Sequence, residues 1–158
     1  LMAAWLAGCG TSPPPREPAG QANLPQATSR PSSAPGNEVV LYALGLIDTG
    51  YRFGGKNPEA GLDCSGMVSY IYEQALGIGI KGSAADIARR GKARSKEGLR
   101  PGDLVFFNTR NAAFSHVGIY IGDERFVHAP STNGRVRIDR LNDRYYAQRY
   151  EAARTFFD

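Results

Sequence analysis

Three side chains in this sequence could together carry out nucleophilic catalysis. Cys64 lies in the motif Asp63-Cys64-Ser65-Gly66, directly before an amphipathic stretch, so we expect it in the first turn of a helix. The unpaired N–H groups and the positive end of the helix dipole at that position favour the thiolate, which is the nucleophilic form of cysteine. His116 and His128, the only histidines in the chain, follow downstream. A thiol, a histidine base and a second group that orients the base are the components of a cysteine hydrolase.

The two histidines are expected on neighbouring strands of one hairpin. Residues 116–122 alternate strictly between apolar and other side chains, and His116 points away from the apolar face. Gly122-Asp123 is a hairpin signal, and residues 125–129 form the next strand. A simple turn leaves His116 and His128 at neighbouring positions, so a bulge or a slip of one residue would bring them onto one face. The sequence leaves this register open, and the site further requires that the cysteine helix pack against the histidine face.

The remaining patterns predict helices in the first half of the folded region and strands in the second. Residues 38–47 have a helical pattern, and the helix at Cys64 should end at Gly77. Ser83-Ala84-Ala85-Asp86 has the form of a capping box, with Asp in place of the usual Glu or Gln, and it opens a short helix that Gly91 ends. Further strands are expected at residues 104–107, 136–139 and 152–157, and a helical turn at residues 145–146. Helices followed by an antiparallel meander are an α+β pattern.

Length and charge limit the functions that this chain can have. It has 158 residues, of which 42% are hydrophobic, and this suits one folded domain. The net charge is +4, and we expect the densest basic run, residues 89–96, to be a solvated helix end and loop. A nucleic-acid-binding protein would show a basic stripe with interleaved aromatic residues or a known module, and neither is visible, so no nucleic-acid partner is expected. An anionic cell-wall polymer is compatible with this charge.

The first 37 residues predict an anchor and a tether. Leu6-Ala7-Gly8-Cys9 matches the bacterial lipobox, in which the cysteine is lipidated, and residues 1–9 are expected to be a truncated signal segment because no basic residue precedes the cysteine. Residues 10–37 are rich in Pro and Ser and lack apolar periodicity, so we expect a disordered tether. Residues 38–158 would then form the folded domain. No segment has the roughly 20 apolar residues of a membrane span. This layout is typical of a lipid-anchored envelope protein, and Gly10 favours the outer membrane by analogy with lipoprotein sorting.

Each candidate residue also has another interpretation. A lone cysteine at a helix start can be a small buried hydrophobe. Zinc is a sharper alternative, because the cysteine, the two histidines and Asp63 could supply four ligands. Structural zinc sites, however, usually pair their ligands closely in sequence, and these residues are widely spaced, so we expect no metal and no cofactor. Ser65 and Ser115 are weaker nucleophile candidates than a thiol.

Five motifs follow one another across the folded region. They are Tyr51-x-Phe53-Gly54-Gly55, Asp63-Cys64-Ser65-Gly66, Leu99-x-Pro101-Gly102-Asp103-Leu104-Val105-Phe106-Phe107, Ser115-His116-Val117-Gly118-Ile119-Tyr120-Ile121-Gly122 and Phe126-Val127-His128-Ala129. In this order they resemble the NlpC/P60 family of cysteine peptidases, which have a papain-like fold and act on bacterial cell walls. The lipobox and tether resemble the single-domain lipoproteins of this family from Gram-negative envelopes. The resemblance implies an α+β fold with N-terminal helices packed on an antiparallel β-sheet.

The resemblance also implies a role for each matching residue. Cys64 would attack a stem-peptide carbonyl and form a thioester. His116 would act as the base and then as the acid for the leaving amine, and His128 would orient it. Tyr51 would lie beside the thiol and support the oxyanion site together with the backbone N–H of Cys64. The positions that match residues near the substrate's amine are Asp63 and Ser65.

These inferences predict a monomeric peptidoglycan endopeptidase at the periplasmic face of the envelope. Its substrate would be an amide bond of the stem peptide or the cross-link, either γ-D-Glu–diamino acid or D-Ala–diamino acid. Two alternatives stay open. The same acyl-enzyme could serve an acyltransferase or an amidase with another envelope substrate. A catalytically silent wall-binding lipoprotein would have the anchor without the hydrolysis.

Overall fold

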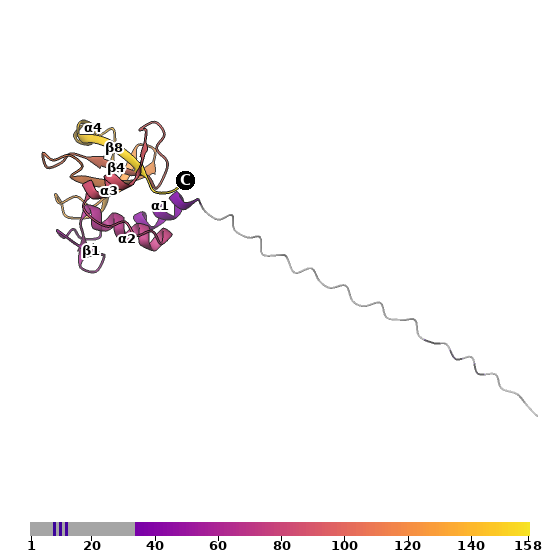
Figure 1. Ribbon diagram of the computed structural model, residues 1–158. Coiled ribbons are helices and arrows are strands. Elements are labelled where there is room, and N and C mark those ends of the chain that lie inside the picture. The colour runs from indigo at the N-terminus through magenta and orange to yellow at the C-terminus, as the bar shows by residue number, and fades with distance from the viewer. Residues whose placement is uncertain (1–7, 9, 11, 13–33) are drawn as a thin grey trace, which may run out of the picture. The chain divides into compact units, whose positions relative to one another are not determined.

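The chain folds with its helices first and most of its sheet afterwards, in the α+β arrangement that the sequence predicts (Figure 1). A computed structural model describes residues 8, 10, 12 and 34–158. The helices are α1 (Pro35–Gly45), α2 (Cys64–Leu76), α3 (Ala84–Arg90) and α4 (Arg144–Arg149). No helix among these described residues is long and apolar enough to cross a membrane.

One antiparallel sheet of six strands organises the domain, in the order β3-β8-β4-β5-β6-β7. Its strands are β3 (Lys92–Arg94), β4 (Leu104–Phe107), β5 (His116–Gly122), β6 (Arg125–His128), β7 (Arg137–Arg140) and β8 (Tyr150–Thr155). A separate two-stranded ribbon, β1 (Lys56–Asn57) and β2 (Gly61–Leu62), lies between α1 and α2 in the chain. The predicted strands are therefore present, with ends that differ by one or two residues.

Local sequence signals fix both ends of the cysteine helix. The Asp63 carboxylate accepts the backbone N–H of Gly66 at 2.7 Å, which satisfies one unpaired donor of the first turn of α2. At the other end Gly77 adopts the left-handed conformation, with φ of 65°, and closes the helix. The capping box of α3 is also formed, with Ser83 and Asp86 bonding each other's backbone as predicted.

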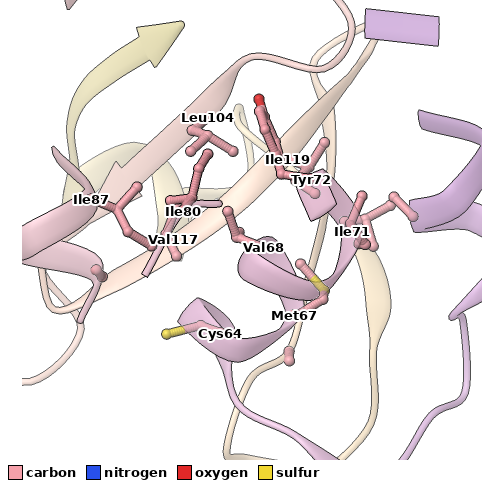
Figure 2. Packing of buried hydrophobic residues seen from close by; sticks show 14 of the residues in the cluster. Cys64, Met67, Val68, Ile71, Tyr72, Ile80, Ile87, Leu104, Val117 and Ile119 are labelled. Atoms are coloured by element: carbon pink, nitrogen blue, oxygen red, sulfur yellow. The ribbon is translucent and has the colours of Figure 1, made fainter. Parts of the chain in front are cut away.

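The main core lies between α2 and one face of the sheet. Met67, Val68 and Ile71 of α2 are fully buried against Val117 and Ile119 of β5 (Figure 2). These residues are the apolar stripe of the helix and the apolar face of the strand that the sequence pattern predicts. The helix therefore packs on the face of β5 opposite to its histidine, which corrects the expected packing against the histidine face.

A smaller, aromatic core covers the other face of the sheet. Phe107, Phe126 and Tyr146 pack there, with ring centroids of the two phenylalanines 4.9 Å apart. Tyr146 comes from α4, the helix formed where a helical turn is predicted. His116 pairs with Phe107 across β4 and β5, so its side chain lies on this aromatic face.

The hairpin of β5 and β6 settles the register that the sequence leaves open. Ile119 pairs with Val127 and Tyr120 with Phe126, and the register then shifts by one residue before the turn. Continued along the strands, this pairing sets His128 opposite Gly118, so both histidines share one face. A Cβ atom on Gly118 would lie 2.7 Å from the Phe126 ring and 3.3 Å from the Cβ of His128. Glycine at this position therefore leaves the space that lets the two imidazoles meet.

Two further segments differ from the sequence prediction. Helix α1 begins at Pro35, inside the expected tether, because proline fits the first helical turn and Gly36 packs directly against the backbone of Pro101. Residues 92–94 of the basic run, predicted as a helix end and loop, form strand β3 beside β8. Most of the predicted signal segment, Cys9 included, and most of the predicted tether lie outside the described residues.

Candidate active site

Cys64 occupies the first position of α2, as predicted, and its side chain is only 8% exposed. Its sulfur projects from the start of the helix, away from the core residue Met67 (Figure 2). The backbone N–H groups of Val117 and Ser65 act on the thiol and lower its pKa. Because Val117 follows His116 in the chain, the thiol lies close to the beginning of β5, at the edge of the core on the α2 face.

The glycines around the cysteine allow a close approach between a turn and the start of α2. A Cβ atom on Gly66 would overlap the carbonyl oxygen of Gly55, so the two backbone segments touch. The Asp63 carboxylate reinforces this contact by accepting the backbone N–H of Gly54 at 2.9 Å. The glycines of two separate motifs therefore serve one purpose, which is to fix the position of the thiol.

The two histidines are in direct contact. Nε2 of His116 lies 2.7 Å from Nδ1 of His128, and both side chains are buried at 6% and 0% exposure. The rings meet edge to face, 5.0 Å between centroids at 79°. Since Nε2 of His116 is engaged in this contact, Nδ1 is the ring nitrogen that remains to exchange a proton with a thiol.

A carboxylate extends this chain of contacts. Oδ2 of Asp139, on β7, lies 2.6 Å from Nε2 of His128, and it also accepts Nε–H of Arg137 at 2.8 Å. A carboxylate only accepts, so Nε2 of His128 donates, and its neutral ring offers Nδ1 as an acceptor. His116 must then donate through Nε2, which leaves its Nδ1 unprotonated. Asp139 thus determines which nitrogen of His116 can act as a base.

Burial sets the charge states of the resting site. It lowers the pKa of His116 to about 3, with the neighbouring His128 and Arg110 acting in the same direction. Burial also raises the pKa of the Cys64 thiol above its ordinary value, although the N–H of Val117 acts against it. The N–H of Ser65, in the first turn of the helix, also lowers this pKa, which is the direction that the sequence predicts, but burial outweighs both N–H groups. The resting site holds a neutral thiol and a neutral imidazole.

The carboxylate at the far end of the chain is ionised. Burial alone would raise the pKa of Asp139, but hydrogen bonds from His128 and Arg137 outweigh it and the pKa is lowered. Burial lowers the pKa of His128, and the hydrogen bond to Asp139 opposes that effect. The negative charge is therefore available to stabilise positive charge that develops on the histidines.

Asp63 and Ser65 line the same cavity as the thiol, and Tyr51 contacts Arg110, which also lines that cavity. The Tyr51 hydroxyl accepts a long hydrogen bond of 3.5 Å from Arg110. Ser65 donates its hydroxyl to Asp63 at 3.3 Å, and both side chains line the cavity in front of Cys64. Both oxygens of Asp63 already accept protein donors, so this residue braces the helix start as well as facing the cavity.

Two cavities have catalytic groups in their walls. The first, of about 640 Å³, is lined by Asp63, Cys64 and Ser65 together with the exposed Phe53. The second, of about 400 Å³, contains polar and aromatic side chains and has His116 in its wall; its other lining residues include Arg137, Asp139, Tyr145 and Tyr146. Arg110 lines both cavities. The thiol and the imidazole therefore each line a different cavity, and Arg110 is common to both. Within the described part of the chain, no group of three or more His, Cys, Asp and Glu side chains is arranged to hold a metal ion.

The sequence model of the NlpC/P60 family matches residues 48–155, which include every catalytic candidate of the folded domain. The chain belongs to the NlpC/P60 family. Solved structures of the family share its fold: an NlpC/P60 protein from Bacillus cereus superposes with a TM-score of 0.73 at 32% identity, covering 81% of this chain and 42% of that one. The NlpC/P60 domain of the peptidoglycan hydrolase SagA gives 0.66 at 30% identity, covering 77% and 98%.

Curated relatives of this NlpC/P60 chain include enzymes with different names. The gamma-DL-glutamyl hydrolase of Bacillus subtilis is 40% identical over 119 residues, 75% of this chain and 29% of that protein. The murein DD-endopeptidase MepS/murein LD-carboxypeptidase of Escherichia coli K12 is 40% identical over 104 residues, 66% of this chain and 54% of that protein. The chain thus spans about half or less of the length of these two relatives.

Three charged residues of the NlpC/P60 site are absent from the sequence prediction. Arg137 and Asp139 lie on the same face of β7, but nothing in the sequence spacing relates either residue to His128 on the preceding strand. The signal that could have found them is the antiparallel pairing of β6 with β7, which sets His128 opposite Arg137. Arg110 lies in a loop, where sequence patterns do not predict side-chain position.

Proposed function

We propose that this protein is a lipid-anchored peptidoglycan endopeptidase that hydrolyses a stem-peptide or cross-link amide through a Cys64 thioester. The observation that supports it most directly is the chain of contacts from Asp139 through His128 to His116, which leaves Nδ1 of His116 unprotonated and able to act as a base. Membership of the NlpC/P60 family, with relatives named as murein endopeptidases, supports the cell wall as the substrate.

Acylation begins with transfer of the thiol proton. Nδ1 of His116 takes this proton as the sulfur of Cys64 attacks the carbonyl carbon of the scissile amide. The new C–S bond gives a tetrahedral oxyanion, for which the backbone N–H of Cys64 and the hydroxyl of Tyr51 are the proposed donors. Because the resting thiol and imidazole are both neutral, this proton transfer accompanies attack on the substrate.

Collapse of the oxyanion breaks the C–N bond. The leaving amine takes the proton from the His116 imidazolium, and the acyl group remains on sulfur as a thioester. Water then gives a proton to His116 and attacks the thioester carbonyl. The C–S bond breaks, the thiolate recovers the proton, and the products are a carboxylic acid and a free amine.

Digestion of purified cell-wall peptides tests this function. The wild-type protein should release one new amine and one new carboxylic acid per bond cleaved, as measured by mass spectrometry, and Cys64→Ala should release none. Ser69→Ala, which changes a residue farther along α2 in the wall of the same cavity, serves as a control for folding and substrate access. Cleavage that persists in Cys64→Ala would disprove the thioester mechanism. Transfer of the acyl group to an added amine, without free acid, would indicate an acyltransferase.

The anchor is tested separately from the chemistry. Cys9→Ser should move the full-length protein, expressed with a complete signal peptide, from the membrane fraction to the soluble envelope fraction and leave hydrolysis by the folded domain unchanged. Ser12→Ala is a matched control in the same segment. An unchanged membrane fraction for Cys9→Ser would contradict lipid anchoring.

A further inference from the structure

Tyr51 is held next to the residues that lead into the cysteine helix. Its backbone N–H donates to the carbonyl oxygen of Gly134 at 2.6 Å, and its main chain forms an isolated bridge with Leu62 of β2. Leu62 precedes Cys64 by two residues. The side chain of Tyr51 is partly buried and packs against the main core. The position of Tyr51 relative to the first turn of α2 is therefore fixed by the backbone and the core.

The hydroxyl group of Tyr51 depends on Arg110 for its orientation. Nη2 of Arg110 donates to it at 3.5 Å, and this is its one hydrogen bond within the part of the chain that the structure describes. A guanidinium donates and never accepts, whereas a phenol hydroxyl does both. The hydroxyl proton must therefore point away from Arg110, and it remains available to an acceptor on a ligand.

Arg110 belongs to the loop that leads directly into the catalytic base. The backbone N–H of Thr109 donates to Oγ of Ser115 at 2.9 Å, and this bond closes the loop just before His116. Arg110 also lines both cavities, the one with the thiol in its wall and the one with the imidazole. Arg110 therefore links the loop of the base to the hydroxyl of Tyr51, across 59 residues of sequence.

The charge of Arg110 has only a small direct effect on the catalytic groups. Its side chain is exposed, so solvent screens the charge, and none of the ion pairs among the described residues involves it. Burial is the main cause of the raised pKa of Cys64 and of the lowered pKa of His116, and Arg110 makes a smaller contribution that lowers both. The contact with Tyr51 is therefore the main route by which Arg110 can influence the reaction.

We propose that Arg110 is a positioning residue, which holds the hydroxyl of Tyr51 so that its proton points to the oxyanion of the tetrahedral intermediate. The inference rests on the proposed function, because that oxyanion forms when Cys64 attacks the scissile amide. The oxyanion is absent from the bound substrate, so loss of Arg110 should lower kcat and leave KM nearly unchanged. An arginine that held the substrate itself would act on KM instead.

A double-mutant cycle with Tyr51→Phe tests this inference on purified cell-wall peptides, with kcat and KM measured for each variant. Tyr51→Phe removes one oxyanion donor and should lower kcat about 100-fold. Arg110→Gln keeps the hydroxyl but frees it to turn. It should lower kcat about 10-fold, near the lower limit for a hydrogen bond to a charged group, because this bond is long. When Tyr51→Phe is already present, Arg110→Gln should lower kcat by less than about twofold.

Two further variants distinguish positioning from a general loss of charge. Arg110→Lys keeps a charged donor and should recover part of the lost kcat, but only while the Tyr51 hydroxyl is present. Arg144→Gln removes an exposed arginine of α4 that lines neither cavity, and it should match the wild type. Circular dichroism of each variant establishes that it is folded.

The outcomes separate this inference from the function that it rests on. Equal losses for Arg110→Gln with and without Tyr51→Phe would overturn it, because Arg110 would then act independently of the hydroxyl. A higher KM with unchanged kcat would also overturn it and would make Arg110 a substrate-binding residue. In both cases the wild type still cleaves, so the endopeptidase function stands. If the wild type releases no amine from any of these peptides, the proposed function itself fails, and the inference fails with it.

Discussion

Replacing Asp139 with alanine should slow catalysis although this residue touches neither the thiol nor the reacting atoms. Its carboxylate, 2.6 Å from Nε2 of His128, fixes the tautomer of both histidines. Without it, His128 can rotate or change tautomer, and Nδ1 of His116 is no longer held unprotonated towards the thiol. The negative charge that stabilises a developing imidazolium is also removed, and Arg137 loses the partner that neutralises it.

The size of the effect follows from two contacts. A hydrogen bond to a charged group contributes about 1.5–3 kcal/mol, so a loss of this size in the transition state lowers kcat about 10- to 100-fold. The Nε2–H group of His128, which is fully buried, would also lose its acceptor. An unsatisfied buried donor costs about 1–3 kcal/mol of folding stability. Asp139→Asn keeps an oxygen acceptor and removes the charge, so its kcat should lie between those of the wild type and the alanine variant.

The assay is steady-state hydrolysis of a cross-linked peptide, with the pH dependence of kcat as a second measurement. Asp139 opposes the lowering of the His128 pKa, so its removal should lower that pKa further and make the imidazolium harder to form. The fall in kcat should therefore be larger than any change in KM. Asp158→Ala, at the exposed C-terminus, is the matched control for loss of one carboxylate.

Two results would refute this reasoning. A folded Asp139→Ala variant with kcat within about twofold of the wild type would show that the tautomer of His116 is fixed by other groups. An equal loss of activity in Asp139→Asn and Asp139→Ala, with unchanged pH dependence, would show that Asp139 acts only on the structure of β7. Measurement of Tm for each variant separates a loss of stability from a loss of catalysis.

Three further predictions concern packing and charge. Gly118→Ala should lower the free energy of unfolding by about 1–3 kcal/mol in urea titrations and reduce kcat, because the new Cβ meets the Phe126 ring and His128. An unchanged free energy of unfolding and an unchanged kcat would mean that the hairpin adjusts freely. Alkylation of Cys64 by iodoacetamide, followed by mass spectrometry, should accelerate as pH rises and continue to do so above 9.0, the ordinary pKa of the thiol; a rate independent of pH would indicate a preformed thiolate. The folded protein holds His116 neutral, with a pKa of about 3 against an ordinary 6.5, so its contribution to stability is complete above 6.5 and is lost as pH falls towards 3. Thermal unfolding across that range should therefore show a smaller acid-induced fall in Tm for His116→Gln than for the wild type.

The sequence predicts those parts of the fold in which one local pattern is strong. The helix at Cys64 has a cap, an apolar stripe and a terminating Gly77, and it forms with the predicted ends. The capping box at Ser83 is equally local and also forms. Helix α1 starts before its predicted first residue. Pro35 and Gly36 have the composition of a linker, and the contact of Gly36 with Pro101, which holds them in the helix, is not visible in the local sequence.

The candidate site is less predictable because it depends on pairings between strands. The histidines meet through a one-residue register shift between Tyr120 and Gly122, and a local pattern does not encode such a shift. Asp139 reaches His128 through the pairing of β6 with β7. The connection between these strands contains the turn signal Asn133-Gly134, but at this length the signal does not fix which residues pair. The side chains that set the charge of the site are thus the ones that sequence patterns cannot place.

The position of His116 at the first residue of β5 explains how groups from opposite faces of a sheet form one site. Cys64 belongs to the core on the α2 face, and the histidines belong to the aromatic core on the other face. Deeper in the strand, the sheet itself would separate them. At the strand's beginning, the backbone N–H of Val117 lowers the pKa of the Cys64 thiol, while the imidazole of His116 remains packed near Phe107. Each catalytic group is therefore held by its own core, and only the strand's first residues join them.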